Sequence, residues 1–154
     1  MTFLAINPWL TVTVLICEDL ARQDPVAQIV RSVGPNLVIA LLMDGPQLKA
    51  RWSARYATVL ADDPGCSVLS LTSLGMSLLS RPFGDSKSLR NVALWKDAKS
   101  GGPIEVVLPD GADAVVLTLS AEFSEEWTAD GRSDGGSTGY PVLAGIHPIS
   151  LAAS

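Results

Sequence analysis

Apolar residues in the first half of the chain follow two different spacings in turn. Three short runs rich in β-branched residues predict buried strands, at residues 11–17, 36–43 and 67–73. Between them, apolar residues recur every three or four positions, which predicts helices buried on one face at residues 25–33 and 47–62. Crossovers of this length favour neighbouring strands that run parallel, with helices covering the sheet. The expected fold class is therefore α/β.

The second half of the chain is rich in short strand-like runs and turn residues. Apolar runs at residues 92–95, 104–108 and 114–119 predict strands, and the Gly- and Pro-containing segments between them predict hairpin turns. Residues 128–139 are rich in Gly and Ser, which predicts a mobile loop. Because no repeat or linker divides the chain, we expect one domain over residues 1–150 and a frayed tail at 151–154.

Composition then narrows the class of protein. Of 154 residues, 47% are hydrophobic and 18% are charged, which excludes a disordered chain and a coiled coil because so much apolar surface must be buried. The net charge of -5 leaves no basic stripe to neutralise phosphates, so nucleic acid is not an expected partner. Two cysteines and one histidine provide neither a disulfide framework nor a zinc site. We therefore expect a reducing compartment, no metal and no cofactor.

Residues 1–16 are uncharged and mostly apolar. A secretory signal peptide needs a positively charged start, yet the first cationic side chain is that of Arg22. The pair Asn7–Pro8 interrupts the run, so it does not fit a membrane-spanning helix of about 20 apolar residues. We expect an extended start to the chain, a cytoplasmic location and no membrane partner.

Cys17 is the residue with most chemical promise. It ends a predicted strand, and ligands bind at the carboxyl ends of strands in open α/β sheets. The alternative is a buried structural cysteine, which packs as a small hydrophobe. The carboxylates of Glu18 and Asp19 disfavour a thiolate by like-charge repulsion, so a nucleophilic Cys17 needs a nearby cation or base. His147 is a candidate base, but its apolar stretch favours a packed or surface histidine.

Several short segments carry a resemblance to a known family. Val14-Leu15-Ile16-Cys17-Glu18-Asp19-Leu20 resembles the segment that bears the nucleophile in the carbon–nitrogen hydrolase (nitrilase/amidase) superfamily. The similarity continues in Gly34-Pro35-Asn36-Leu37-Val38, in Trp52, Arg55 and Ala57, and in Thr72-Ser73-Leu74-Gly75-Met76-Ser77. The last segment is similar to the family's Asn-x-x-Gly-x-Ser loop, with Ser73 or Thr72 in place of the Asn. The resemblance implies a nitrilase-like αββα sandwich in which Cys17 hydrolyses a small-molecule amide or nitrile.

The resemblance covers only part of the family's pattern. Family members pair the cysteine with a Glu base and a Lys oxyanion stabiliser, both upstream of it, whereas residues 1–16 carry no charge. The chain thus resembles the C-terminal half, a partial sandwich of a mixed sheet with helices on its outer face. We expect Glu18, Asp44 and Ser73 to line the substrate pocket.

An incomplete sandwich has consequences for partners and activity. The chain is then a fragment of a longer hydrolase, a half completed by another chain, or a non-catalytic descendant used as a binding or assembly module. We expect a homo-oligomer or a complementing N-terminal half as partner, because a half sandwich leaves apolar sheet surface unpaired. We also expect Cys17 to be inert toward amides without the missing Glu and Lys.

Overall fold

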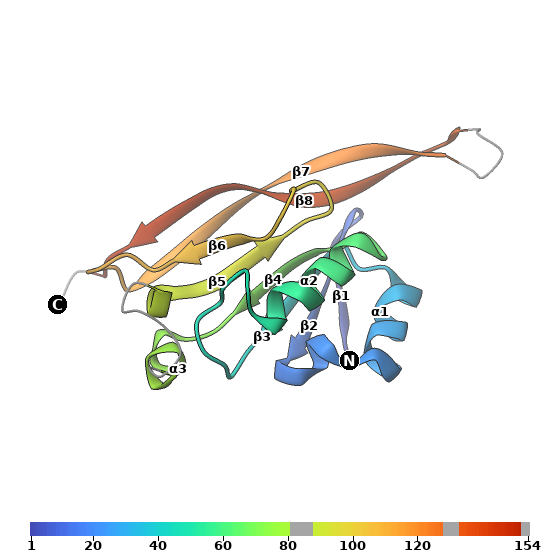
Figure 1. The fold of residues 1–154 in the computed structure, drawn as a ribbon. Coiled ribbons are helices and arrows are strands. Elements are labelled where there is room, and N and C mark those ends of the chain that lie inside the picture. The colour runs from blue at the N-terminus through green and yellow to red at the C-terminus, as the bar shows by residue number, and fades with distance from the viewer. Residues whose placement is uncertain (81–87, 128–132, 152–154) are drawn as a thin grey trace.

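The computed structural model describes residues 1–80, 88–127 and 133–151. A six-stranded mixed sheet forms its centre, with the strands side by side in their order along the chain (Figure 1). They are β1 (Phe3–Asn7), β2 (Leu10–Ile16), β3 (Leu37–Leu41), β4 (Ser67–Leu71), β5 (Asn91–Lys96) and β6 (Ile104–Val107). β2, β3 and β4 run parallel, and the remaining neighbours are antiparallel. The α/β class is confirmed.

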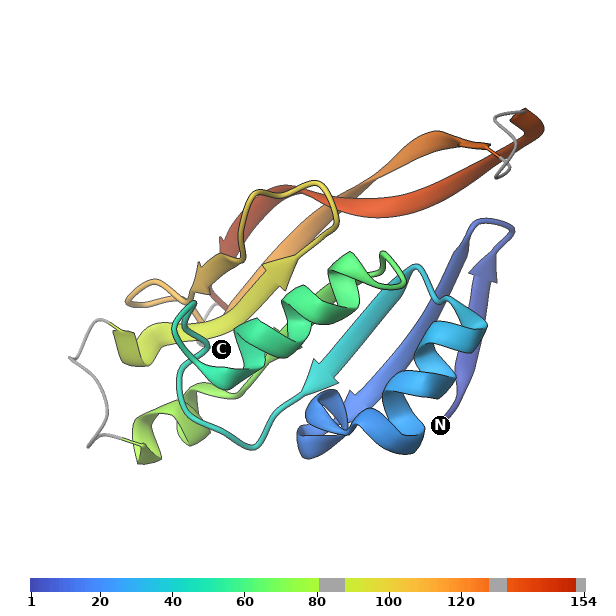
Figure 2. The ribbon, with the colours of Figure 1, turned by 45° about the vertical axis from the view of Figure 1, so that its right-hand side comes forward.

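Two of the three helices, α1 (Gln28–Val33) and α2 (Trp52–Asp62), cover one face of the sheet (Figure 2). Side chains alternate between the two faces along each strand, and those on the helix-covered face include Leu15, Val38 and Val68. These three residues form a buried core with Val30 of α1 and Leu60 of α2. The third helix, α3 (Leu74–Leu79), follows β4. None of the helices in the described ranges is both long and apolar enough to cross a bilayer.

A long antiparallel hairpin lies on the other face of the sheet, and its far end extends beyond it (Figure 1). It consists of β7 (Ala114–Trp127) and β8 (Ser133–Ile149). Leu143 of β8 packs against a small second core around the buried Trp95. The Ser67 hydroxyl also donates a hydrogen bond to the carbonyl of Pro141 in β8, at 2.6 Å. The sheet is therefore covered by helices on one side and in part by the hairpin on the other.

Part of the hairpin-side face carries exposed apolar side chains. Leu4 pairs with Val12, which belongs to the second core, so both lie on this face. Val14 and Ile16 follow Val12 at alternate positions of β2, and Leu41 pairs with Ile16. The exposed fractions are 52% for Leu4, 39% for Val14, 54% for Ile16 and 41% for Leu41. We call these four residues the open face.

Most predicted elements are present, and the differences include the following. The extended start forms β1, whose antiparallel pairing with β2 the apolar pattern did not predict. The helix predicted from residue 47 begins at Trp52, because the preceding segment is held by other contacts described below. The loop predicted over 128–139 is wrong for 133–139, which belong to β8, while 128–132 lie outside the described residues, as does 152–154 of the predicted frayed tail. The Gly and Ser residues of this part of β8 are typical of loops, so the sequence did not predict a strand there.

Candidate functional site

Cys17 is the first residue after β2 and begins the short helical turn η1 (Cys17–Ala21). The predicted position at a strand end is confirmed. Its φ of 50° lies in the left-handed region, and no other non-glycine residue of the described ranges has a positive φ. This conformation costs about 1–2 kcal/mol for a residue with a Cβ, and such residues cluster at functional sites. The backbone therefore turns sharply at the one residue singled out for its chemistry.

Contacts on both sides of Cys17 hold the sharp turn in place. Leu20, on the inner side of η1, is 3% exposed and belongs to the core beneath α1 and α2. The backbone N–H of Ile16 donates to the Asp19 carboxylate at 3.4 Å, a long contact across the start of the turn. With Leu20 buried inward, Cys17, Glu18 and Ala21 are left on the outer side of η1.

A pocket of about 610 Å³ lies at the carboxyl ends of β2 and β3, where Figure 2 shows η1 beside the end of β3. Three segments line it: η1 with the residue after it, the residues that follow β3, and the first turns of α2. The lining residues are Cys17, Glu18, Ala21, Arg22, Met43, Asp44, Trp52 and Tyr56. The volume is typical of sites for small molecules. Three of the four predicted site residues, Cys17, Glu18 and Asp44, are thus brought together.

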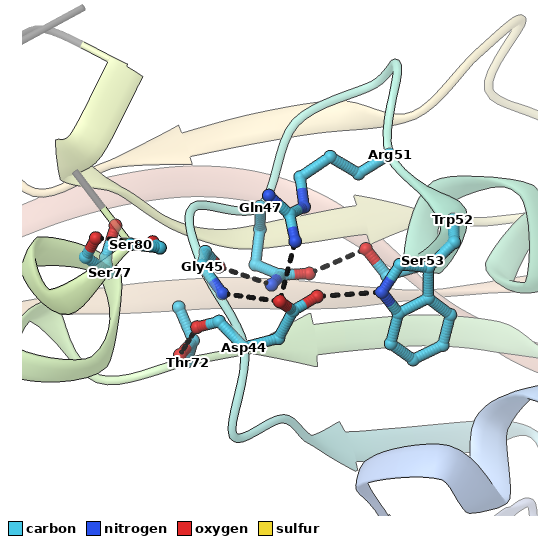
Figure 3. A network of polar contacts seen from close by, with 9 residues as sticks. All are labelled: Asp44, Gly45, Gln47, Arg51, Trp52, Ser53, Thr72, Ser77 and Ser80. Carbon is cyan, nitrogen blue, oxygen red and sulfur yellow. Dashed lines mark hydrogen bonds and ion pairs between the residues drawn. The ribbon is translucent and has the colours of Figure 1, made fainter. Parts of the chain in front are cut away.

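Asp44 is held by hydrogen bonds to both of its carboxylate oxygens (Figure 3). Oδ1 accepts from the Gly45 backbone N–H at 2.7 Å and from Nη2 of Arg51 at 2.6 Å. Oδ2 accepts from Nε1 of Trp52 at 2.8 Å. Burial alone would raise the pKa of Asp44, but these hydrogen bonds and the Arg51 charge outweigh burial and lower it. Asp44 therefore stays ionised and fixes the pocket wall, because its oxygens already have partners.

The segment between β3 and α2 is held in an irregular path by Gln47 (Figure 3). Gln47 is fully buried, its backbone N–H donates to the carbonyl of Asn91 at 2.7 Å, and its Oε1 accepts from the Ser53 hydroxyl at 2.8 Å. Gly45 leaves no room for a side chain, because a Cβ there would lie 2.6 Å from the Ser80 hydroxyl oxygen. These contacts place the start of α2 at the pocket and prevent an earlier helix.

Two pocket side chains carry opposite charges, and neither has a hydrogen-bond or ion-pair partner within the described part of the chain. Glu18 directly follows Cys17, and Arg22 follows η1; both are exposed. The sequence did not place Arg22 in the pocket, although a nucleophilic Cys17 requires a nearby cation or base. The available signal was nearness along the chain: Arg22 is the first cationic residue, five positions after Cys17.

The remaining candidates, Ser73 and His147, are not among the residues that line the pocket, and neither is the second cysteine, Cys66. Ser73 caps α3, because its hydroxyl oxygen accepts the backbone N–H of Met76 at 3.2 Å. Cys66 is buried, and burial raises the pKa of its thiol to about 12. His147 is exposed in β8, where it pairs with Val116 on the hairpin. None of these three residues lines the pocket together with Cys17.

The chemistry available at the pocket is that of a thiol, a carboxylate and a guanidinium beside an aromatic wall. Across the described residues, no group of three or more His, Cys, Asp or Glu side chains is arranged to hold a metal ion. No lysine is among the residues that line the pocket.

Comparison with protein-family models gives no match. Neither the curated proteins nor the solved structures contain a significant match to this chain.

Proposed function

We propose that this chain is the nucleophile-bearing half of a nitrilase-like carbon–nitrogen hydrolase. The observation that carries the proposal is the left-handed turn at Cys17, which begins η1 and lines the 610 Å³ pocket. A strained turn directly after a buried strand presents a nucleophile to a pocket while its backbone stays fixed. This is the position that the family resemblance assigns to the attacking thiol.

The open face supports the second part of the proposal, a sandwich completed by another half. Leu4, Val14, Ile16 and Leu41 form an apolar surface on the side of the sheet away from α1 and α2. In an αββα sandwich, this is the side on which a second sheet packs, about 10 Å away. The complementing half, in the same protein or in a partner chain, would bring the Glu and the Lys.

In the proposed reaction, Sγ of Cys17 forms a bond to the carbonyl carbon of an amide. The C–N bond then breaks, and the amine leaves with the proton of the thiol, carried by the Glu of the complementing half. Water next attacks the thioester: a C–O bond forms, the C–S bond breaks, and the sulfur regains a proton. The Lys would stabilise the oxyanion in both steps. The products are a carboxylic acid and an amine or ammonia.

A specific observation favours the alternative, a non-catalytic binding or assembly module. Both oxygens of Asp44 have partners, and no lysine lines the pocket. Of the pocket carboxylates, only that of Glu18 is then left for acid–base chemistry. In this alternative, the pocket and the open face are kept for binding.

Amide and nitrile hydrolysis by the purified chain, beside Cys17→Ala, separates the possibilities. We expect no turnover by the chain alone, because loss of an electrostatic stabiliser typically costs about 10²–10³ in rate. We expect Cys17-dependent turnover when a segment carrying the Glu and Lys motifs is added. Turnover by the chain alone would refute our account of the missing groups. No turnover in the completed assembly would favour the binding module.

A further inference from the structure

The charges of the pocket leave one cation available for a ligand within the described part of the chain. Two arginines are close to the pocket, but Arg51 is already bonded to Asp44 at 2.6 Å. Arg22 lines the pocket and has no hydrogen-bond or ion-pair partner among the described residues. A guanidinium can donate two parallel hydrogen bonds to one carboxylate, which makes it a selective partner for that group.

Part of the pocket lining is apolar and aromatic. The rings of Trp52 and Tyr56 meet edge to face, with centroids 6.1 Å apart and an angle of 66° between the ring planes. The hydrogen bond from Trp52 to Asp44 fixes the indole. Met43, at 71% exposed, adds a flexible apolar side chain to the lining. Such a wall suits a flat apolar group, which gains stacking and burial there.

Glu18 is the other charged pocket residue without a described partner. Its neighbour in the chain is Cys17. It directly follows Cys17, so it lies beside the atom that would attack the substrate. Arg22 comes five residues after Cys17, past the end of η1. Because Cys17 and Arg22 line the same pocket, one ligand can place its reacting carbonyl at Cys17 and a separate group at Arg22.

From these observations we infer that the pocket takes amides that carry a flat apolar group ending in a carboxylate. Arg22 binds the carboxylate, Trp52 and Tyr56 contact the flat group, and the amide carbonyl meets Cys17. This inference rests on the proposed function for the role of Cys17, but the selection of an anion by Arg22 can be measured without turnover.

Alkylation of Cys17 tests the selection directly. The probes are iodoacetanilide and its para-carboxylated form, which carry the same reactive carbon and phenyl ring. The Cys17 sulfur forms a bond to that carbon, and iodide leaves. Rates are measured by peptide mass spectrometry, and the same two rates with N-acetylcysteine give the intrinsic ratio. We expect the carboxylated probe to be favoured on the folded chain by about 2- to 5-fold over that ratio, the range of an exposed ion pair.

Two variants show whether Arg22 is responsible. Arg22→Gln is expected to return the ratio to that of N-acetylcysteine, and about 1 M salt to do the same in the parent chain. Arg55→Gln is the matched control, because Arg55 is exposed on α2 and does not line the pocket; it should leave the ratio unchanged. Since the Arg22 side chain has no described partner, the substitution removes no observed contact of the fold.

The outcomes separate this inference from the proposed function. Equal effects of Arg22→Gln and Arg55→Gln would overturn the inference. A third probe, iodoacetanilide with a para-trimethylammonium group, tests the opposite charge, and a preference for it would also overturn the inference because it would point to Glu18 instead. Selection by Arg22 together with no turnover in the completed assembly would keep the ligand class and refute the hydrolase. Turnover of neutral amides with no selection by Arg22 would support the hydrolase and refute the ligand class.

Discussion

Asp44 shows how one side chain sets the position of several others. The sequence predicts it at the pocket because it follows a buried strand, and there it lies. Its bonding could not be predicted, because Arg51 and Trp52 reach it only through the irregular path of residues 45–51. The residue expected to line the substrate pocket also supports the wall that a ligand would touch.

Asp44→Asn is expected to lower the free energy of unfolding by about 1–3 kcal/mol near neutral pH, because it removes charge-assisted hydrogen bonds. The pKa of Asp44 is lowered from 3.8 in the folded chain, so its stabilisation is present above that value and is lost as the pH falls through the folded pKa. Urea unfolding at about pH 7, 5 and 3 should show the difference between parent and variant shrinking with acid.

Asp62→Asn provides the control for this measurement. Asp62 is the exposed last residue of α2 and has no ion-pair partner among the described residues. Its substitution should change stability little at any of these pH values. If Asp44→Asn behaves like Asp62→Asn, the three hydrogen bonds contribute nothing to folding.

The strands and helices around the pocket were largely predictable because their apolar spacing is strong. The spacing gave wrong predictions where contacts between distant residues determine the backbone conformation. Leu48 fits the helical spacing that leads to Trp52, yet the buried Gln47 and its bonds to Asn91 and Ser53 prevent a helix there. In β8, Gly and Ser residues favoured a loop, but pairing with β7 keeps 133–139 extended.

Ser73 follows the end of β4, as predicted, but it is not among the residues that line the pocket. Its hydroxyl accepts the Met76 N–H and begins α3. Ser73→Ala is therefore expected to lower the free energy of unfolding by about 0.5–2 kcal/mol, and Ser73→Asp to restore it, since Asp is an equally good cap.

The rate of Cys17 alkylation completes the test of Ser73. It should be the same in the parent chain and in Ser73→Ala, because Ser73 is not among the residues that line the pocket. A large change in that rate with no loss of stability would instead return Ser73 to the site.

The molecule as a whole is asymmetric in how its sheet is covered. Helices bury one face completely enough that Val38 and Val68 have no exposed surface. The hairpin covers the other face only in part, which leaves the open face to solvent. Contiguous apolar surface of this kind is found at interfaces and promotes association.

We therefore expect the chain to self-associate in solution when no complementing half is present. The double variant Leu4→Lys, Val14→Lys places two charges on the open face and should shift the mass measured by light scattering toward one chain of 16.2 kDa. Leu79→Lys is the control, because Leu79 is 78% exposed on α3, away from that face. A parent chain that stays monomeric at high concentration would contradict the expectation.

Because Cys66 is buried and Cys17 is not, alkylation of the two cysteines can report how often the core opens. Its thiol is 1% exposed and lies 3.2 Å from the carbonyl oxygen of Leu60, between α2 and β4. A small alkylating reagent therefore adds one group to the folded chain, at Cys17, and a second only when α2 lifts from β4. In a series of intact-mass spectra, the appearance of the doubly modified chain reports how often this part of the molecule opens under native conditions.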